Sequence, residues 1–112
     1  MNNTELSRKT RKKLRELCKI AYARELNHHL EQLGQKFDGW RHNDIDCWDL
    51  NDLIHAFHDG TSRDLYKVYH YTKNEDYLVS RAFKLGFVQK DELPEGFSVL
   101  LLPMVKGLFS DN

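Results

Sequence analysis

The stretch YARELNHHLEQLGQKFDGW, residues 22–40, decides the fold expected for this chain. At about 100° per residue on a helix, its apolar side chains gather on one face. They are Tyr22, Leu26, Leu30, Leu33, Phe37 and Trp40. Leu14, Cys18 and Ala21 continue this stripe toward the N-terminus. The pattern predicts a long amphipathic helix from about Thr4 to about Phe37, with Gly34 a weak point near its end.

A turn is expected over residues 38–44, followed by a second helix. Asp46 precedes Asp49 by three residues, a spacing close to that of a capping box. The apolar residues after it recur at helical spacing: Leu50, Leu53, Ile54 and Phe57. Gly60 is expected to end this helix.

Two more helices are expected to follow. Thr61 is in a capping position before a third helix, which should run to about Tyr71. Asn74 is the expected N-cap of a fourth helix over residues 75–85, and Gly86 fits the position just past its end.

The last segment predicts a kinked helix from Pro94 toward Phe109, because Pro103 interrupts it. Residues 1–7 and 110–112 are expected to be frayed. The sequence shows no strand pattern or internal repeat. The expected fold is all-α: a single domain over residues 1–112, built as a compact bundle of four to five helices with a long N-terminal amphipathic helix.

The composition excludes some classes of protein. The 112 residues carry 17 basic and 17 acidic side chains, so the zero net charge excludes a globally basic polyanion binder. The most apolar run, residues 97–105, is far shorter than the roughly 18 residues of a membrane span. The polar, basic start has no apolar signal region. A cytoplasmic protein without a membrane segment is expected.

Charge is unevenly distributed along the chain. Residues 8–15 form a basic cluster that includes Arg8, Lys12 and Lys13, whereas residues 38–64 hold seven aspartates. The cluster could contact nucleic acid phosphates or an acidic protein surface. A solvated helix end is the simpler explanation, because basic runs are common and nucleic acid recognition needs more than charge.

The six histidines prompt a search for a metal site. Glu25 with His28 and Asp52 with His55 are spaced three apart, so each pair could share one helix face, as in carboxylate-bridged dimetal bundles. His55 with His58 is a second candidate pair for zinc. The simpler reading has Asp52 and His55 facing water and His58 at a helix end, so no cofactor is expected.

Arg24, four intervening residues and His29 form a short motif. It resembles the active-site motif of the helical HEPN ribonucleases. That resemblance implies a phosphate-stabilising role for Arg24 and an acid or base role for His29. A packed histidine beside Glu25 is the alternative interpretation.

A second resemblance covers longer stretches: RELN at 24–27, FDGW at 37–40, DLNDLIHAFHDG at 49–60 and RDLYK at 63–67. Together they resemble a small bacterial family of helical proteins with no established activity. The resemblance implies a compact helical protein and brings no catalytic residues with it.

The most economical expectation is a non-enzymatic module that binds a protein partner or forms a homodimer. Trp40, Trp48 and His55 are the expected contact residues, together with the basic cluster. Cys18 and Cys47 match no zinc or disulfide pattern and are expected to be small buried residues. The alternatives left open are a metal-binding or HEPN-like RNA phosphodiesterase and non-catalytic nucleic acid binding through residues 8–15.

Overall fold

The structure is a computed structural model, and it describes residues 8–95 and 97. These residues form helices and include no strand, which confirms the all-α expectation. The chain divides into two compact units, one made of the residues up to Ala21 and from Thr72 onward, the other of Tyr22–Tyr71. The kinked helix expected near Pro103 and the frayed ends lie outside the described residues, and a bundle of four to five helices is not shown.

The first helix, α1 (Arg8–Arg41), is 34 residues long. The expected start at Thr4 lies outside the described residues. The helix continues past the expected end at Phe37, and the Arg41 guanidinium donates a hydrogen bond of 2.8 Å to the Asp38 carboxylate in its last turn. The chain then turns through Asn43, whose φ of 64° is a left-handed conformation that asparagine tolerates.

Helix α2 (Cys47–Ala56) begins where the capping pattern predicts. The Asp46 carboxylate accepts a hydrogen bond of 2.8 Å from the Asp49 backbone N–H. It thereby satisfies one of the N–H groups that have no partner within the helix. The predicted N-cap is confirmed.

Gly60 does not end the helix, and Thr61 does not cap a new one; both predictions are wrong. The chain passes from α2 through a π-helical turn, η1 (Phe57–Ser62), directly into α3 (Arg63–Tyr71). A π-turn accommodates about one extra residue, which rotates all later residues back by about 100°. This rotation keeps Leu65 on the same side as Leu53 and Phe57, so burial of Leu65 outweighs the modest cost of a glycine within a helix.

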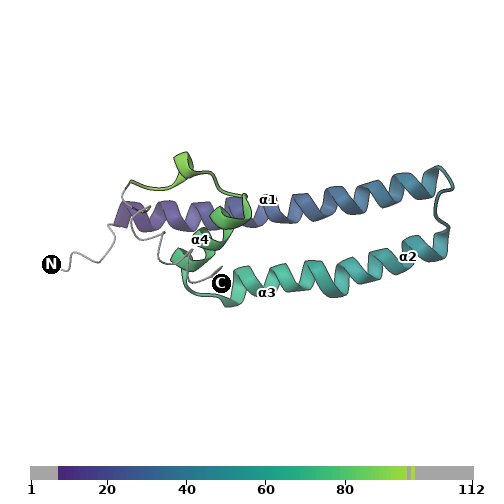
Figure 1. The fold of residues 1–112 in the computed structure, drawn as a ribbon. Helices are drawn as coiled ribbons and strands as arrows, with labels where there is room; N and C mark the ends of the chain where they lie inside the picture. The colour runs from purple at the N-terminus through teal and green to yellow at the C-terminus, as the bar shows by residue number, and fades with distance from the viewer. Residues whose placement is uncertain (1–7, 96, 98–112) are drawn as a thin grey trace, which may run out of the picture. The chain divides into compact units, whose positions relative to one another are not determined.

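The Tyr22–Tyr71 unit is a helical hairpin. Its part of α1 runs antiparallel to the continuous α2–η1–α3 segment (Figure 1). Leu50 and Leu65 are its buried leucines, and the Tyr22 and Tyr69 rings stack at a centroid distance of 4.7 Å. Together with Glu25, these leucines are the buried residues of the unit within the described range 22–71.

The other unit contains the beginning of α1 together with α4 (Glu75–Leu85) and the short 3₁₀ turn η2 (Lys90–Glu92). The Asn74 side chain accepts a hydrogen bond from the Tyr77 N–H, and Gly86 ends α4 with a φ of 91°. Both predicted caps are confirmed. The core of this unit consists of Leu14, Leu17, Ala21, Leu78, Val79, Ala82, Val88 and Phe97. No helix among the described residues is long and apolar enough to cross a membrane.

Two glycines should respond oppositely to alanine. A Cβ at Gly60 meets no atom within 4 Å, so Gly60→Ala should stabilise the fold by about 0.5–1 kcal/mol through helix propensity. Gly86→Ala should destabilise it by about 1 kcal/mol, because its backbone is left-handed. Urea unfolding of both variants measures the difference, and an equal effect of the two substitutions would contradict these assignments.

Candidate interaction surface

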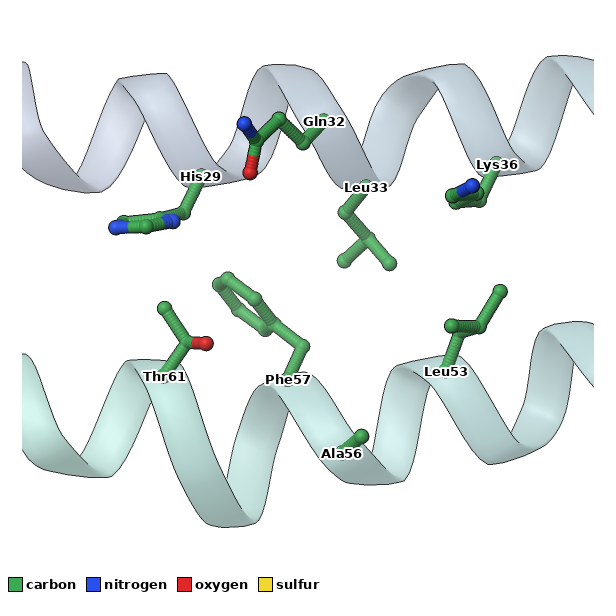
Figure 2. Close-up of a pocket in the computed structure, with 8 residues that line it drawn as sticks. All are labelled: His29, Gln32, Leu33, Lys36, Leu53, Ala56, Phe57 and Thr61. Atoms are coloured by element: carbon green, nitrogen blue, oxygen red, sulfur yellow. The ribbon is translucent and has the colours of Figure 1, made fainter.

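The apolar stripe of α1 does not point directly at the opposite helical segment. The α1 side chains that face α2 and η1 are His29, Gln32, Leu33 and Lys36 (Figure 2). At 100° per residue, Leu26, Leu30 and Phe37 lie about 90° around the helix from these residues. The most apolar side of α1 therefore borders the contact with α2 instead of filling it.

Burial along α1 follows this rotation. Leu30, at the centre of the stripe expected to form the core, is 42% exposed, so that part of the expectation is wrong. Glu25 is only 4% exposed, because it lies on the side of α1 that faces α3. Of the predicted stripe over residues 22–40, Leu30 and Trp40 are exposed, and the other apolar residues are half-buried.

The opposite segment carries a matching stripe at intervals of four residues: Leu50, Ile54, His58, Ser62, Tyr66 and His70. The extra residue in η1 offsets the drift of about 40° per four-residue step and holds the stripe on one side. It too lies about 90° from the residues that face α1, which include Leu53, Phe57 and Thr61 (Figure 2). Ile54 is 37% exposed and Tyr66 is 47% exposed.

The two stripes lie on the same side of the hairpin. On each helix, the stripe lies about 90° around the helix axis from the residues that face the other helix, in the same rotational direction when viewed from the N-terminus. Because the two helices are antiparallel, these two equal rotations place the stripes on the same side of the hairpin. We call this surface the apolar face and define it by the exposed Leu30, Ile54 and Tyr66 with the half-buried Leu26 and Phe37, whereas Leu50, at the start of the second stripe, is buried. No Asp, Glu, Lys or Arg occupies its positions between Leu26 and Trp40 on α1, but Arg41 lies only about 20° from Leu30, at the end of the face near the turn.

A shallow groove runs along the contact between α1 and the α2–η1 segment. It has a volume of about 210 Å³ (Figure 2). Figure 2 shows Thr61 opposite His29 and the Phe57 ring opposite Gln32, while the small Ala56 lies across from Leu33. Its lining is mainly apolar, so the groove could accommodate an aliphatic side chain, with His29 and Gln32 as polar groups at its rim.

Aromatic rings contact one another at the end of the hairpin farthest from the turn. Tyr66 stacks on His70 at 4.0 Å, and His70 meets the Tyr22 ring edge-on at 5.7 Å. The Tyr69 hydroxyl donates a hydrogen bond of 2.8 Å to the buried Glu25 carboxylate. A buried carboxylate needs such a partner, so this contact fixes how α1 and α3 align.

The candidate metal ligands are not assembled. Among the described residues, no three His, Cys, Asp or Glu side chains are grouped so that they could hold a metal ion. Glu25 is buried against Tyr69, whereas His28, Asp52, His55 and His58 are exposed. His58 pairs with its neighbour Asp59 at 3.0 Å, and this hydrogen bond is the main cause of the lowered pKa of the Asp59 carboxyl.

The HEPN-like pair is separated within the chain. Arg24 is exposed, and His29 is half-buried in the wall of the groove. Residues five apart lie about 140° from each other around a helix, so the two side chains leave α1 on different sides. The hairpin by itself does not bring them to one phosphate.

The expected contact residues are exposed but do not form one surface. Trp48 is 74% exposed, and at 100° per residue it lies with His55 on the side of α2 away from α1. Trp40 is 42% exposed near the turn. The basic residues at the start of α1 are also exposed: Arg8, Lys12 and Lys13. Ile54, which the helical spacing placed in the apolar stripe of the second helix, is exposed, and so is Tyr66.

The two cysteines differ in environment. Cys47 is exposed at the first position of α2, so its expected burial is wrong. Cys18 is half-buried, and its Sγ lies 3.9 Å from the Glu75 carbonyl oxygen. Burial, followed by the nearby charges of Glu75 and Asp76, raises the pKa of the Cys18 thiol to about 11.

Comparison of the chain with protein-family models, with curated proteins and with solved structures finds no match. The role of the surface must therefore follow from its own geometry and chemistry. The described residues offer an apolar side of the helical hairpin, a shallow groove beside it and a cluster of aromatic rings at the end of the hairpin away from the turn.

Removing the Tyr69 hydroxyl should destabilise the protein. Tyr69→Phe takes one hydrogen bond from the buried Glu25 carboxylate, and about 1–3 kcal/mol of unfolding free energy should be lost. Tyr66→Phe is the matched control, since the Tyr66 side chain is exposed and should change stability by less than about 0.5 kcal/mol. Equal losses in urea unfolding would contradict a specific role for the Tyr69–Glu25 bond.

The cysteines should react with thiol reagents at very different rates. At mildly alkaline pH, Cys47 should be modified quickly in the folded protein, whereas Cys18 should react only after unfolding, because its raised pKa keeps it protonated. Mass spectrometry of native and urea-unfolded protein would count the modified thiols. In Cys47→Ser the fast reaction should disappear; rapid native labelling of that variant would contradict the environment described for Cys18.

Proposed function

We propose that this protein is a non-enzymatic interaction module that binds another protein chain through the apolar face. The observation that carries the proposal is the exposure of Leu30, Ile54 and Tyr66 on one side of the hairpin. Single exposed apolar residues are common on protein surfaces, but a continuous apolar surface typically marks a binding site.

The energetics of the hairpin support this proposal. Isolated helices depend on tertiary packing for most of their stability, and a hairpin buries only one line of side chains. Here Leu50 and Leu65 are buried, whereas Leu26, Leu33 and Phe37 keep partial contact with solvent. Covering the remaining apolar area would contribute about 25 cal/mol for each Å² removed from water. A partner that packs along the hairpin would supply that burial.

The chemistry of the hairpin also favours binding over catalysis. Its buried acidic group, Glu25, is held by Tyr69, and the HEPN-like pair Arg24 and His29 diverges on α1. Acid–base catalysis needs both groups within reach of one reacting atom. The basic residues 8–15 are a separate surface, and their exposure alone does not distinguish nucleic acid from solvent.

Site-specific photocrosslinking in cells tests the proposal. A photoreactive amino acid at position 30 or 54 should give discrete protein adducts, because both positions lie on the apolar face. Gln35 is exposed on the other side of α1 and is the matched control. Adding Tyr66→Lys should abolish the adducts from position 30. Absence of adducts at 30 and 54, or equal adducts at 35, would overturn the proposed function.

A further inference from the structure

We infer that the groove between α1 and the α2–η1 segment binds a small linear carboxylic acid that carries a hydroxyl group at its far end. Lys36 pairs with the carboxylate, and His29 and Thr61 bind the hydroxyl group. The groove lies within the Tyr22–Tyr71 unit, and none of its lining residues belongs to the apolar face. The inference therefore goes beyond the proposed function and does not depend on it.

The size of the groove limits the size of the ligand. Its volume of about 210 Å³ lies below the roughly 300–1,000 Å³ of pockets that take drug-sized ligands. His29 and Lys36 are seven residues apart on α1, so their backbones are separated by about 10 Å along the helix axis. An extended chain of about eight carbon atoms covers a similar distance. The groove therefore suits a short linear ligand.

The charges around the groove favour an acid. Lys36 is exposed at one end of the groove and forms no ion pair with any described residue (Figure 2). By contrast, the guanidinium groups of Arg41 and Arg63 lie 2.8 Å and 3.8 Å from neighbouring carboxylates. The described residues that line the groove include no Asp or Glu. An amine at this end would meet a like charge, whereas a carboxylate would meet the Lys36 ammonium group.

The opposite end of the groove holds two polar side chains, His29 and Thr61, which face each other (Figure 2). Both are half-buried, and neither forms a side-chain hydrogen bond with any described residue. In contrast, His42 and His70 each bond through Nδ1 to a backbone carbonyl four residues earlier. Polar groups that have partly lost contact with water gain most from a new partner.

A hydroxyl group is the ligand group that matches this end. It both donates and accepts a hydrogen bond, so it can pair with the Thr61 hydroxyl and with His29 in either neutral tautomer. A methyl group at the same place would leave both side chains without a partner. The end of the groove near Lys36 thus prefers a carboxylate, and the end near His29 prefers a neutral polar group.

The middle of the groove is apolar. Leu33 from α1 and Leu53, Ala56 and Phe57 from the opposite segment line it (Figure 2). Contact of these side chains with a methylene chain removes apolar surface from water and supplies most of the affinity. The two polar ends then fix the direction in which the chain lies, which is the usual division of roles in a ligand pocket.

NMR titration of the ¹⁵N-labelled full chain with 8-hydroxyoctanoate tests the inference. The amide signals of Leu33, Ala56 and Thr61 should shift and reach half-saturation at about 1 mM or below, since the ligand has only about eleven non-hydrogen atoms. Octanoate, which lacks the hydroxyl group, should bind about three- to fivefold more weakly. Octane-1,8-diol, which lacks the carboxylate, should also bind about three- to fivefold more weakly.

Variants of the groove test each contact separately. Lys36→Met should raise the dissociation constant of 8-hydroxyoctanoate about three- to fivefold, because it removes an exposed ion pair. Lys67→Met removes the same charge from an exposed position on α3 outside the groove and should leave binding unchanged. Thr61→Val should narrow the difference between 8-hydroxyoctanoate and octanoate. Ala56→Leu should weaken both acids, because the larger side chain fills the groove.

Circular dichroism of each variant separates loss of binding from loss of folding. Unchanged amide signals for Leu33, Ala56 and Thr61 at about 10 mM of 8-hydroxyoctanoate would overturn the site. Equal binding of the diol, or equal effects of Lys36→Met and Lys67→Met, would overturn the pairing with a carboxylate. Equal binding of octanoate would overturn the hydroxyl contact. Crosslinking from positions 30 and 54 is a separate measurement, so failure of this site leaves the proposed function standing.

Discussion

The organisation of the hairpin depends on one angular constraint. In the Tyr22–Tyr71 unit, the most apolar side of α1 is rotated by about 90° from the line along which α1 meets α2 and η1. A helix can present only one direction to a given neighbour, so a rotation of this size divides its apolar residues between an internal contact and an open side. Leu33 lies in the groove of the internal contact, whereas Leu30 lies on the open side.

The rotation is maintained by two features with no apolar character. The hydrogen bond from Tyr69 to the buried Glu25 carboxylate favours this alignment of α1 with α3, because a rotation that kept Glu25 buried away from Tyr69 would remove one of its hydrogen bonds. The extra residue in the π-turn η1 then keeps the apolar residues before and after it on the same side of the helical segment. The hydrogen bond to Glu25 and the single extra residue in η1 thus determine which apolar side chains remain exposed.

Local features of the structure were predictable from sequence, and features that depend on distant contacts were not. Asp46, Asn74 and Gly86 act through hydrogen bonds or backbone conformation within a few residues, so their roles are written in short sequence patterns. Gly60 carried an equally clear local signal, but burial of Leu65 overrode it. For the candidate surface, periodicity identified the α1 stripe but could not reveal which neighbour covers it. Trp48 drew attention by residue type, although it lies away from the apolar face.

The distribution of aromatic residues along the hairpin has a spectroscopic consequence. Both tryptophans of the chain, Trp40 and Trp48, flank the turn between α1 and α2, whereas Tyr22, Tyr66 and Tyr69 form the rings at the opposite end. Ultraviolet spectroscopy therefore has reporters at both ends of this unit, tryptophan emission near the turn and tyrosine absorbance at the opposite end. Tryptophan emission reports separation of the helices that starts at the turn, and tyrosine absorbance reports separation that starts at the other end. The order in which the two ends separate can therefore be measured without an added dye.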